Sequence, residues 1–437
     1  MKIQKFGGTS VGSPQRIKDV ATLITSFPGK NIIVLSAMSG TTNSLLDIIY
    51  SIKDGDLNQA KKLTDSLSKK YEEVIDDLYS TSAAADKALK LIEEVFEDIR
   101  IWINKKYSIR TEKEIVSKGE IISTHLMQFY LEEQGKKSVL IPALDFIFTD
   151  NNGEPAYTSI KNRLNEILPQ YQEYNIIITQ GFICRNPEGK VDNLLRGGSD
   201  FTASIIGAMV NAEEVDIWTD IDGMHNNDPR FVDDTSPVHN LHFEEAAELA
   251  YFGAKILHPT CILPAKLNNV PVRLLNTMKP EAEGTLINNE LEHGSIKAVA
   301  AKDNITAIKI KSSRMLLAYG FLKKVFEVFE KFRTPIDMIA TSEVGVSLTI
   351  DDSTHLEEII HDLKELGTVT IDRDMVIICV VGDLEWQNKG FEARALDALR
   401  NIPVRMISYG GSNYNISFLI DKKNKTKALR LLSYHLF

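Results

Sequence analysis

The sequence predicts an α/β protein in which an open, mainly parallel sheet lies between helices and is followed by a smaller α/β region. Three observations indicate this. The chain has 437 residues, which is long for one compact core. Short, mostly β-branched runs alternate with helical stretches over about the first 290 residues. After Gly294 the elements become shorter and twice follow the order strand, helix, strand, strand, helix.

The chain opens with a predicted strand, a glycine turn and a helix. Residues 1–6 alternate as a strand does, and Ser13-Pro14 is a favourable N-cap and first helical residue. Apolar residues then recur at i, i+3, i+4 and i+7, which predicts one buried helical face: Ile17, Val20, Ala21 and Ile24. Strands buried on both sides are expected at 32–35, 176–178, 215–218 and 270–275. Two or three surface helices are expected between 54 and 110.

The pattern divides the chain into a domain at 1–292 and a region at 293–437. The region holds two ferredoxin-like units, the first at about 304–373 and the second at about 374–437. The second unit is one strand short, and the apolar segment at 296–301 can supply that strand. The first unit would then be inserted within the second.

Composition excludes several classes of protein. The longest apolar runs are strand-sized, well short of the roughly 18 residues that a membrane helix needs. Three widely spaced cysteines fit neither a zinc site nor a disulfide framework and are expected in the core. A formal net charge of −10 argues against nucleic acid as a partner. We therefore expect a cytoplasmic protein.

Two glycine-rich turns, each followed by a helix, predict anion binding. Residues 5–10 read Lys-Phe-Gly-Gly-Thr-Ser, and residues 196–200 read Arg-Gly-Gly-Ser-Asp. Backbone N–H groups at such turns bind phosphate, and the cations offset its charge. Neither turn is a P-loop or a dinucleotide fingerprint, and either could be a plain turn. The second helix is expected from Phe201.

Further motifs complete a recognisable set. Ser36 to Asn43 reads S-x-x-x-G-x-T-N, and Ser117-Lys118-Gly119-Glu120, Trp218-Thr219-Asp220 and Asp228-Pro229-Arg230 follow. In this order the motifs resemble the aspartate kinase family of the amino-acid kinase superfamily, over essentially the whole chain. Segments 320–322 and 336–344 resemble the effector-binding ACT domains of these kinases, most closely the lysine-sensitive members.

The resemblance implies transfer of the γ-phosphoryl group of Mg-ATP to the β-carboxylate of L-aspartate, with Mg²⁺ held by phosphates and water and no dedicated protein metal site. It implies catalytic roles for Lys5 and Asp200. The implied substrate-binding residues are Thr42, Glu120, Arg196, Gly197, Gly198 and Ser199. The implied ATP-binding residues are Lys5, Phe6, Gly7, Gly8, Ser36, Thr219, Asp220, His225, Arg230, Lys255 and Ile256.

The resemblance also implies regulation and assembly. The effector residues would be Met315, Gly320, Leu322, Asp337, Thr341 and Ser342. An aspartate suits an ammonium ligand, so L-lysine is the expected inhibitor, with threonine or a weakened response as the next alternatives. Ala318 and Pro335 stand where lysine-sensitive relatives often have serine. A homodimer through the ACT units is expected.

Two departures from the family pattern keep alternatives open. Leu195 stands where the family usually has glycine, and His225 stands where a tyrosine commonly lies near the nucleotide. Leucine reaches positive φ only at a cost, which bears on rate and affinity. One alternative is another amino-acid kinase, acting on glutamate or acetylglutamate. Another is a non-catalytic amino-acid sensor with the kinase fold. The charged residues also have a simpler reading as caps or surface salt bridges.

Overall fold

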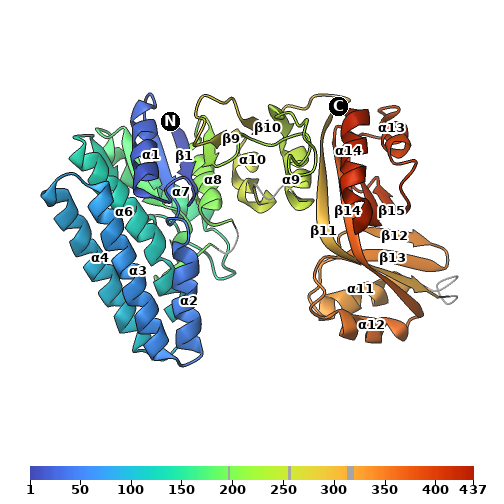
Figure 1. Cartoon of the computed structure of the whole chain (residues 1–437), viewed down its shortest axis with the longest axis horizontal. Helices are drawn as coiled ribbons and strands as arrows, with labels where there is room; N and C mark the ends of the chain where they lie inside the picture. Colours follow the sequence, from blue (N-terminus) through green and yellow to red (C-terminus); the bar gives the residue numbers. More distant parts are fainter. Residues whose placement is uncertain (195–196, 254–256, 313–318) are drawn as a thin grey trace. The chain divides into compact units, whose positions relative to one another are not determined.

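The computed structural model describes residues 1–194, 197–253, 257–312 and 319–437 (Figure 1). Its contacts divide the chain into two compact units. The first comprises Met1–Gly223 and Leu257–Asn289, and the second comprises Met224–Ile256 and Glu290–Phe437. By contacts, therefore, the segment 224–256 groups with the C-terminal part of the chain, although it lies inside the N-terminal domain that the sequence pattern predicts.

The first unit begins with the predicted strand, turn and helix and then alternates helices with strands. Its helices are α1 (Pro14–Ser26), α2 (Thr41–Lys53), α3 (Leu57–Leu78), α4 (Ser82–Ile103), α5 (Ile109–Val116), α6 (Lys118–Glu133), α7 (Tyr157–Ile167), α8 (Gly198–Val210) and α10 (Leu263–Leu267). Its strands are β1 (Lys2–Phe6), β2 (Asn31–Leu35), β3 (Ser138–Leu140), β4 (Ile176–Gln180), β5 (Ile183–Arg185), β6 (Val191–Asn193), β7 (Val215–Thr219), β9 (Val272–Asn276) and β10 (Thr285–Asn288).

The main sheet of this unit has the strand order β3-β4-β2-β1-β7-β9-β10. Every pair from β3 to β9 is parallel, and only β10 runs antiparallel to its neighbour β9. Helices α1 to α6 share one apolar core with one face of the sheet. Helix α8 contacts β1, β2 and β7 and packs with α7 and α10. The sheet therefore lies between two helical layers, and its parallel strands end at one common edge.

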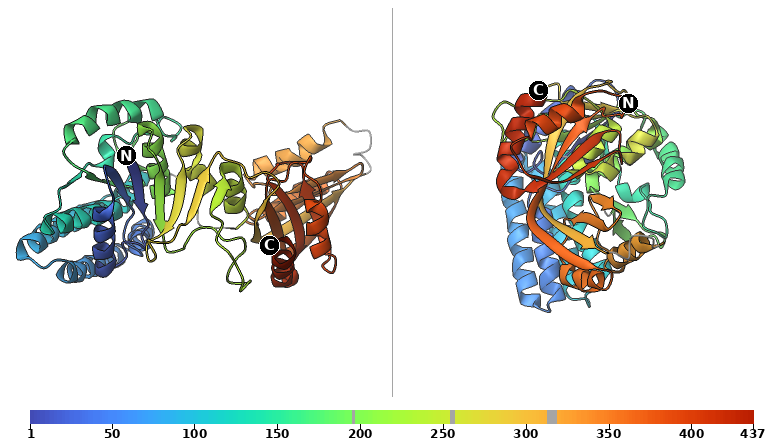
Figure 2. Two further views of the ribbon diagram at one scale, coloured as in Figure 1. Left: turned by 90° about the horizontal axis from the view of Figure 1, so that it is seen from above. Right: turned by 90° about the vertical axis from the view of Figure 1, so that its right-hand side faces the viewer.

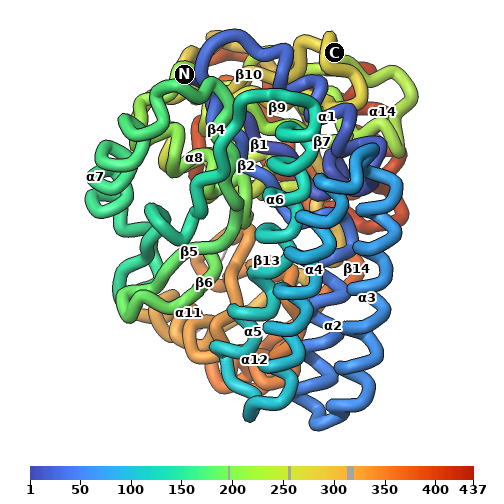
Figure 3. The backbone as a smooth tube through the Cα atoms, turned by 90° about the vertical axis from the view of Figure 1, so that its left-hand side faces the viewer, coloured from blue at the N-terminus to red at the C-terminus, as the bar shows by residue number. Residues whose placement is uncertain are grey.

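Local sequence rules explain the helices. The Ser13 side chain accepts a hydrogen bond from the Arg16 N–H, and Pro14 opens α1, as predicted. The predicted apolar face of α1 is buried. Helices α2, α3 and α4 run side by side (Figure 3). Each buries one face and exposes the charged residues of its other face, as expected of surface helices.

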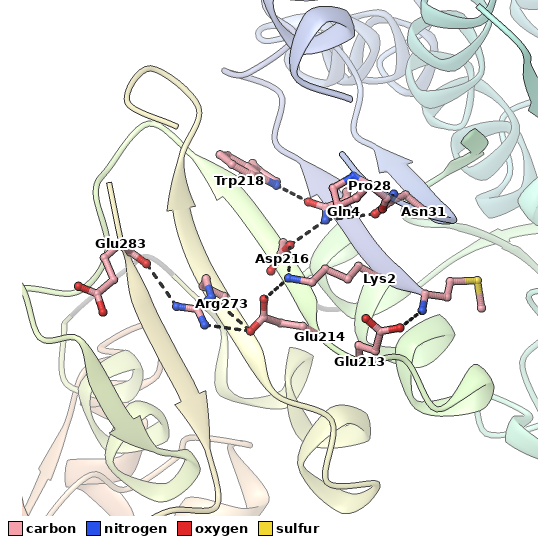
Figure 4. A network of polar contacts seen from close by, with 11 residues as sticks. Lys2, Gln4, Pro28, Asn31, Glu213, Glu214, Asp216, Trp218, Arg273 and Glu283 are labelled. Carbon is pink, nitrogen blue, oxygen red and sulfur yellow. Dashed lines mark hydrogen bonds and ion pairs between the residues drawn. The ribbon is translucent and has the colours of Figure 1, made fainter. Parts of the chain in front are cut away.

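A polar network joins the amino ends of three neighbouring strands, at the opposite edge from the predicted site (Figure 4). The Gln4 amide donates to Asp216 Oδ2 at 2.7 Å. Glu214 Oε1 lies 2.7 Å from Lys2 Nζ, and its Oε2 lies 3.1 Å from Arg273 Nη2. Burial, together with the nearby Glu214 carboxylate, raises the pKa of Asp216 to about 7. This carboxyl group is therefore easier to bury when protonated.

We expect Asp216→Asn to stabilise the protein at alkaline pH. The pKa of Asp216 is higher in the folded state than in the unfolded state. At pH values between these two pKa values the folded state binds more protons than the unfolded state, so the stability of the wild type falls as pH rises toward 7. Thermal unfolding should show a melting temperature raised by a few degrees at pH 8.5, with a smaller rise at pH 5.5. Asp76→Asn, at an exposed position of α3, is the control. Identical melting temperatures of wild type and Asp216→Asn at both pH values would contradict this reading.

The second unit combines the mid-chain segment Met224–Ile256 with the C-terminal region. Its helices are α9 (Phe243–Tyr251), α11 (Phe321–Lys331), α12 (Leu356–Lys364), α13 (Phe391–Ala398) and α14 (Lys425–Leu436). Its strands are β8 (Asn240–His242), β11 (Ile296–Lys311), β12 (Ile339–Ser342), β13 (Gly345–Ile350), β14 (Thr368–Gly382), β15 (Val404–Tyr409) and β16 (Asn415–Asp421).

One sheet of order β12-β13-β11-β14-β16-β15 runs through the whole C-terminal region (Figure 2). Strands β11 and β14 are long and pair antiparallel over two stretches, separated by a register shift. Residues 296–302 pair with 377–382, and 305–311 pair with 368–375. A single strand, 368–382, thus crosses the boundary that the sequence pattern places between residues 373 and 374. A separate apolar core lies on each half of this sheet.

Candidate active site

Lys5 and Asp200 form an ion pair near the carboxyl edge of the main sheet. Lys5 Nζ lies 2.6 Å from Asp200 Oδ1, and their side chains are 10% and 17% exposed. Asp200 lies in the first turn of α8, which begins at Gly198. The prediction that this helix begins at Phe201 is wrong. The helix begins three residues earlier, at Gly198, because Gly197 adopts φ +63° and forms its N-cap. Asp200 is therefore a first-turn residue directed at Lys5.

The first glycine turn packs tightly against the segment that follows β2. A Cβ on Gly8 would lie 2.7 Å from the Ala37 carbonyl oxygen. The Gly8 carbonyl accepts from the Ser39 N–H at 3.1 Å. The hydroxyl of Ser10 lies 2.7 Å from that of Thr277. Only glycine fits at position 8 without moving one of these two turns.

We expect Gly8→Ala to lower both stability and activity. The added methyl group would force the two turns apart, which costs about 1 to 3 kcal/mol for overpacking of this kind. Displacement of the turn should also raise the KM for the ATP that the motif resemblance implies. Chemical denaturation and ADP-release kinetics would measure the two effects. Gly411→Ala is the matched control, because a Cβ there meets nothing within 4 Å. Equal stability and equal KM for the two variants would argue against a constrained turn.

Glu120 is a buried carboxylate at the same edge, on the other helical layer. It lies in the first turn of α6 and is 5% exposed. Its Oε1 accepts from the Ala37 N–H at 3.3 Å. Its Oε2 is buried and has no hydrogen-bond partner within the described part of the chain. Burial raises the pKa of Glu120 to about 7. A buried carboxylate oxygen of this kind is suited to a cationic ligand.

Ser36 and Ala37 connect these groups. The Ser36 hydroxyl donates to Ser199 Oγ at 2.8 Å, next to Asp200 in sequence. The Ser36 carbonyl accepts from the Ser123 hydroxyl at 2.7 Å. Ser123 was not predicted as a site residue, although it lies three residues after Glu120 and so on the same side of α6. The structure thus brings Lys5, Asp200, Ser199, Ser36, Gly8 and Glu120 to one sheet edge.

Other predicted residues in the first unit contribute in different ways. The Phe6 ring is fully buried and stacks on Trp218, with ring centres 5.7 Å apart, so the ring itself is not available to a ligand. Thr42 is partly buried in the first turn of α2. Thr219 ends β7, and its hydroxyl donates to Asp220 Oδ1 at 3.2 Å.

Two of the predicted nucleotide contacts that the structure describes belong to the second unit. Arg230 is exposed and holds Asp228, with Nη2 2.6 Å from Oδ2. His225 Nδ1 lies 3.0 Å from Thr235 Oγ1. Six residues of the sequence analysis lie outside the described residues: Leu195, Arg196, Lys255, Ile256, Met315 and Ala318.

The remaining predicted effector residues all lie in the second unit. Gly320, at φ +83°, caps α11, and Leu322 is a partly exposed residue of that helix. Asp337 precedes β12, and its N–H donates to the Thr349 carbonyl at 2.9 Å. Thr341 and Ser342 are exposed residues of β12.

Two searches of the described ranges concern metals and membranes. No group of three or more His, Cys, Asp or Glu side chains able to hold a metal ion occurs in residues 1–194, 197–253, 257–312 and 319–437. Over the same ranges, no helix combines the length and the apolar character required to cross a membrane.

Comparison with known proteins decides the family. The model of the amino acid kinase family matches residues 1–276, and a model of the ACT domain matches residues 378–436. Aspartokinase 1, chloroplastic, of Arabidopsis thaliana is 34% identical over 458 residues, which cover 100% of this chain and 80% of that protein. The chain belongs to the aspartokinase family. Its α/β kinase fold and C-terminal ACT region confirm the predicted fold class.

Two solved structures of an aspartokinase cover the whole chain. Escherichia coli aspartokinase III in complex with lysine and aspartate, a T-state, is 30% identical, with a TM-score of 0.83 and coverage of 100% of both chains. The same enzyme in complex with aspartate and ADP, an R-state, is 29% identical, again with a TM-score of 0.83 and full coverage of both chains. The resemblance inferred from the motifs is therefore confirmed over the full length.

Proposed function

We propose that this aspartokinase family member transfers the γ-phosphoryl group of ATP to the β-carboxylate of L-aspartate, giving 4-phospho-L-aspartate and ADP. One observation carries the proposal. The unpartnered Oε2 of buried Glu120 lies at the same sheet edge as the Lys5–Asp200 pair. The reaction needs an anionic side chain that binds the ammonium group of the substrate. It also needs a cationic side chain that offsets the charge of the transferred phosphoryl group. The E. coli complex with aspartate and ADP supports the same pair of reactants.

Phosphoryl transfer to a carboxylate needs positioning and charge compensation more than a base, because the nucleophile is already ionised. Lys5 neutralises the phosphoryl oxygens as charge develops on them. Asp200 keeps the Lys5 ammonium in place through the 2.6 Å contact. Both α6 and α8 begin at this edge, so their N-terminal N–H groups add positive potential where the anionic reactants meet.

Substrate recognition rests on opposite charges. Glu120 Oε2 receives the ammonium of aspartate, and Arg196 pairs with a carboxylate of the substrate. Hydroxyl groups and the second glycine turn supply further hydrogen bonds; these residues are Thr42, Gly197, Gly198 and Ser199.

We assign nucleotide binding to Lys5, Phe6, Gly7, Gly8, Ser36, Thr219, Asp220, His225, Arg230, Lys255 and Ile256. Mg²⁺ suits this donor set, because Asp200 and Asp220 offer hard oxygen ligands. When bound with ATP, the ion offsets phosphate charge.

We further propose that L-lysine inhibits the enzyme through the ACT region, which the lysine complex of E. coli aspartokinase III supports. The effector residues are those named above, with the kinase domain at 1–292 and the ACT units at about 304–373 and 374–437. Pairing of ACT units would make the enzyme a homodimer, and its place in the cytoplasm stays a prediction.

The decisive assay is ADP release by the purified protein with Mg-ATP and L-aspartate, with hydroxylamine to trap the acyl phosphate. Aspartate-dependent turnover that millimolar L-lysine suppresses is the expected result. Turnover that neither lysine nor threonine changes would remove the effector assignment and keep the kinase. Absence of turnover with aspartate, or turnover with glutamate instead, would overturn the proposed reaction.

A further inference from the structure

Gln180 and Thr124, which were not predicted as site residues, form a buried hydrogen-bonded chain that ends at Glu120. The Gln180 amide Nε2 donates to Thr124 Oγ1 at 2.9 Å, and the Thr124 hydroxyl donates to the Glu120 carbonyl oxygen at 2.8 Å. At the other end, Gln180 Oε1 accepts from the Ala143 N–H at 2.8 Å. Gln180 is 2% exposed and Thr124 is fully buried. Both side chains therefore satisfy their polar atoms away from water.

A second contact holds the same turn of α6 from the neighbouring strand. The Ser123 hydroxyl, which donates to the Ser36 carbonyl, also lies 3.2 Å from the Glu120 carbonyl oxygen. Leu35, next to Ser36, ends β2 and is paired in register with Gln180, which ends β4. The first turn of α6 is therefore bonded to the ends of two adjacent parallel strands.

Glu120 depends on these bonds because its own helix gives it little support. Ser117, the N-cap of α6, lies in the right-handed helical region and makes no side-chain capping bond. The Glu120 carboxylate accepts from the Ala37 N–H at 3.3 Å, which is long for such a bond. Its Oε2 has no hydrogen-bond partner among the described residues. The location of the carboxylate is thus set mainly by the backbone of this turn.

Thr124 makes one contact more than an ordinary helical threonine. A threonine in a helix often donates to the carbonyl four residues earlier, and that bond alone implies no function. Thr64 in α3 is such a residue, since it is fully buried and donates to the Ala60 carbonyl at 2.8 Å. The Thr124 oxygen also accepts from Gln180, on another element. A hydroxyl that both donates and accepts is fixed in orientation, and hydrogen bonds linked in this way strengthen one another.

We propose that Gln180 and Thr124 are positioning residues that hold Glu120 where its Oε2 binds the ammonium of the amino-acid substrate. This inference rests on the proposed function. Both residues act through the first turn of α6 and not by touching the substrate. Loss of the chain would let this turn move and misplace the carboxylate, whereas the Lys5–Asp200 pair comes from other elements and would stay. The cost should therefore appear in the binding of aspartate.

Thr124→Val tests the chain, because valine has the shape of threonine and lacks the hydroxyl. We expect KM for L-aspartate to rise about 10-fold, a factor typical of residues that share one hydrogen-bond network. KM for ATP and kcat should change by less than about 3-fold, as should all three constants in Thr124→Ser, which keeps the hydroxyl. Thr64→Val, which loses the same kind of helical bond in α3, is the matched control for lost stability.

Gln180→Met removes the other link and should raise KM for L-aspartate by a similar factor. In the Glu120→Gln background, Thr124→Val should have almost no further effect on that KM, because no charge is left to position. An unchanged KM for aspartate in Thr124→Val and Gln180→Met would overturn the proposal. An equal loss in Thr124→Ser, an equal rise in KM for both substrates, or a full further rise in the Glu120→Gln background would also overturn it.

Calorimetry of L-aspartate binding separates this inference from the proposed reaction, because binding needs no turnover. The Kd for aspartate should rise about 10-fold in Thr124→Val and stay near the wild-type value in Thr124→Ser. A wild type that binds aspartate without releasing ADP would reject the reaction, and the Kd values would still decide the positioning role. Equal Kd values in wild type and Thr124→Val would reject the positioning role alone. A wild type that does not bind aspartate would overturn both.

Discussion

Lys5→Met is expected to lower kcat by at least about 100-fold, the loss typical of removing one preorganised charge-stabilising donor. Lys5 is the cation placed at the carboxyl end of β1, 2.6 Å from Asp200. Its charge is needed most when the γ-phosphoryl group is between donor and acceptor, so KM for aspartate should change by less than about 3-fold. ADP release with hydroxylamine trapping measures both constants.

The same substitution tests whether the loss comes from catalysis or from misfolding. Lys5→Met leaves Asp200 without its partner, which should lower the melting temperature. The double variant Lys5→Met/Asp200→Asn removes the unpaired charge and should regain stability while remaining inactive. Lys62→Met, on an exposed position of α3, should match the wild type. A Lys5→Met enzyme within about 5-fold of wild-type kcat would remove Lys5 from the mechanism.

The local elements of the first unit were predictable because short-range rules decide them. A strand, two glycines, a Ser-Pro cap and an apolar face spaced at helical intervals specify β1 and α1 without help from the rest of the chain. The three cysteines are buried and free, as their spacing suggests. Glu120 was found through the motif that contains it, but its burial and its unpartnered oxygen came only from the structure.

Contacts between distant segments were not predictable from pattern. Periodicity states which face of an element is buried and says nothing about its partner. The Tyr251–Asp337 hydrogen bond joins residues 86 positions apart, and the Lys302–Asp337 bond joins residues 35 apart. The start of α8 was missed for another reason, because a glycine in the left-handed region caps this helix where a polar side chain is the usual signal.

Glu120→Gln is the second substitution with a large expected effect, a rise in KM for L-aspartate of about 100-fold, the size expected when one partner of a buried charged contact is lost. Glutamine keeps the size of the side chain and can still accept from the Ala37 N–H. It cannot offer a negative charge to the substrate ammonium. KM for ATP should change by less than about 3-fold. Glu94→Gln, exposed on α4, is the control. An unchanged KM for aspartate would mean that the ammonium binds elsewhere.

The pH dependence of kcat/KM for aspartate shows whether the charge of Glu120, rather than the shape of its side chain, is needed for substrate binding. Burial raises the pKa of Glu120 to about 7, so in the free enzyme the group is mostly protonated below that pH. Since only the carboxylate attracts the ammonium, kcat/KM for aspartate should fall as pH decreases through about 7. In Glu120→Gln this limb should be absent. A wild-type profile that stays flat from pH 8 to pH 6 would show that Glu120 is ionised throughout or does not bind substrate.

Glu120→Gln should weaken aspartate binding and yet raise the stability of the folded protein. A substitution that merely damaged the fold would not produce both effects. A carboxyl group whose folded-state pKa lies above its unfolded value destabilises the fold increasingly as pH rises between the two, and fully above the folded-state pKa. Glu120→Gln removes that cost, on the order of 3 kcal/mol for a change of this size. Denaturant titrations should therefore find the variant more stable than the wild type at pH 8 and equal to it near pH 4. A variant that is more stable and yet binds aspartate more weakly identifies a carboxylate kept for its ligand at the expense of the fold.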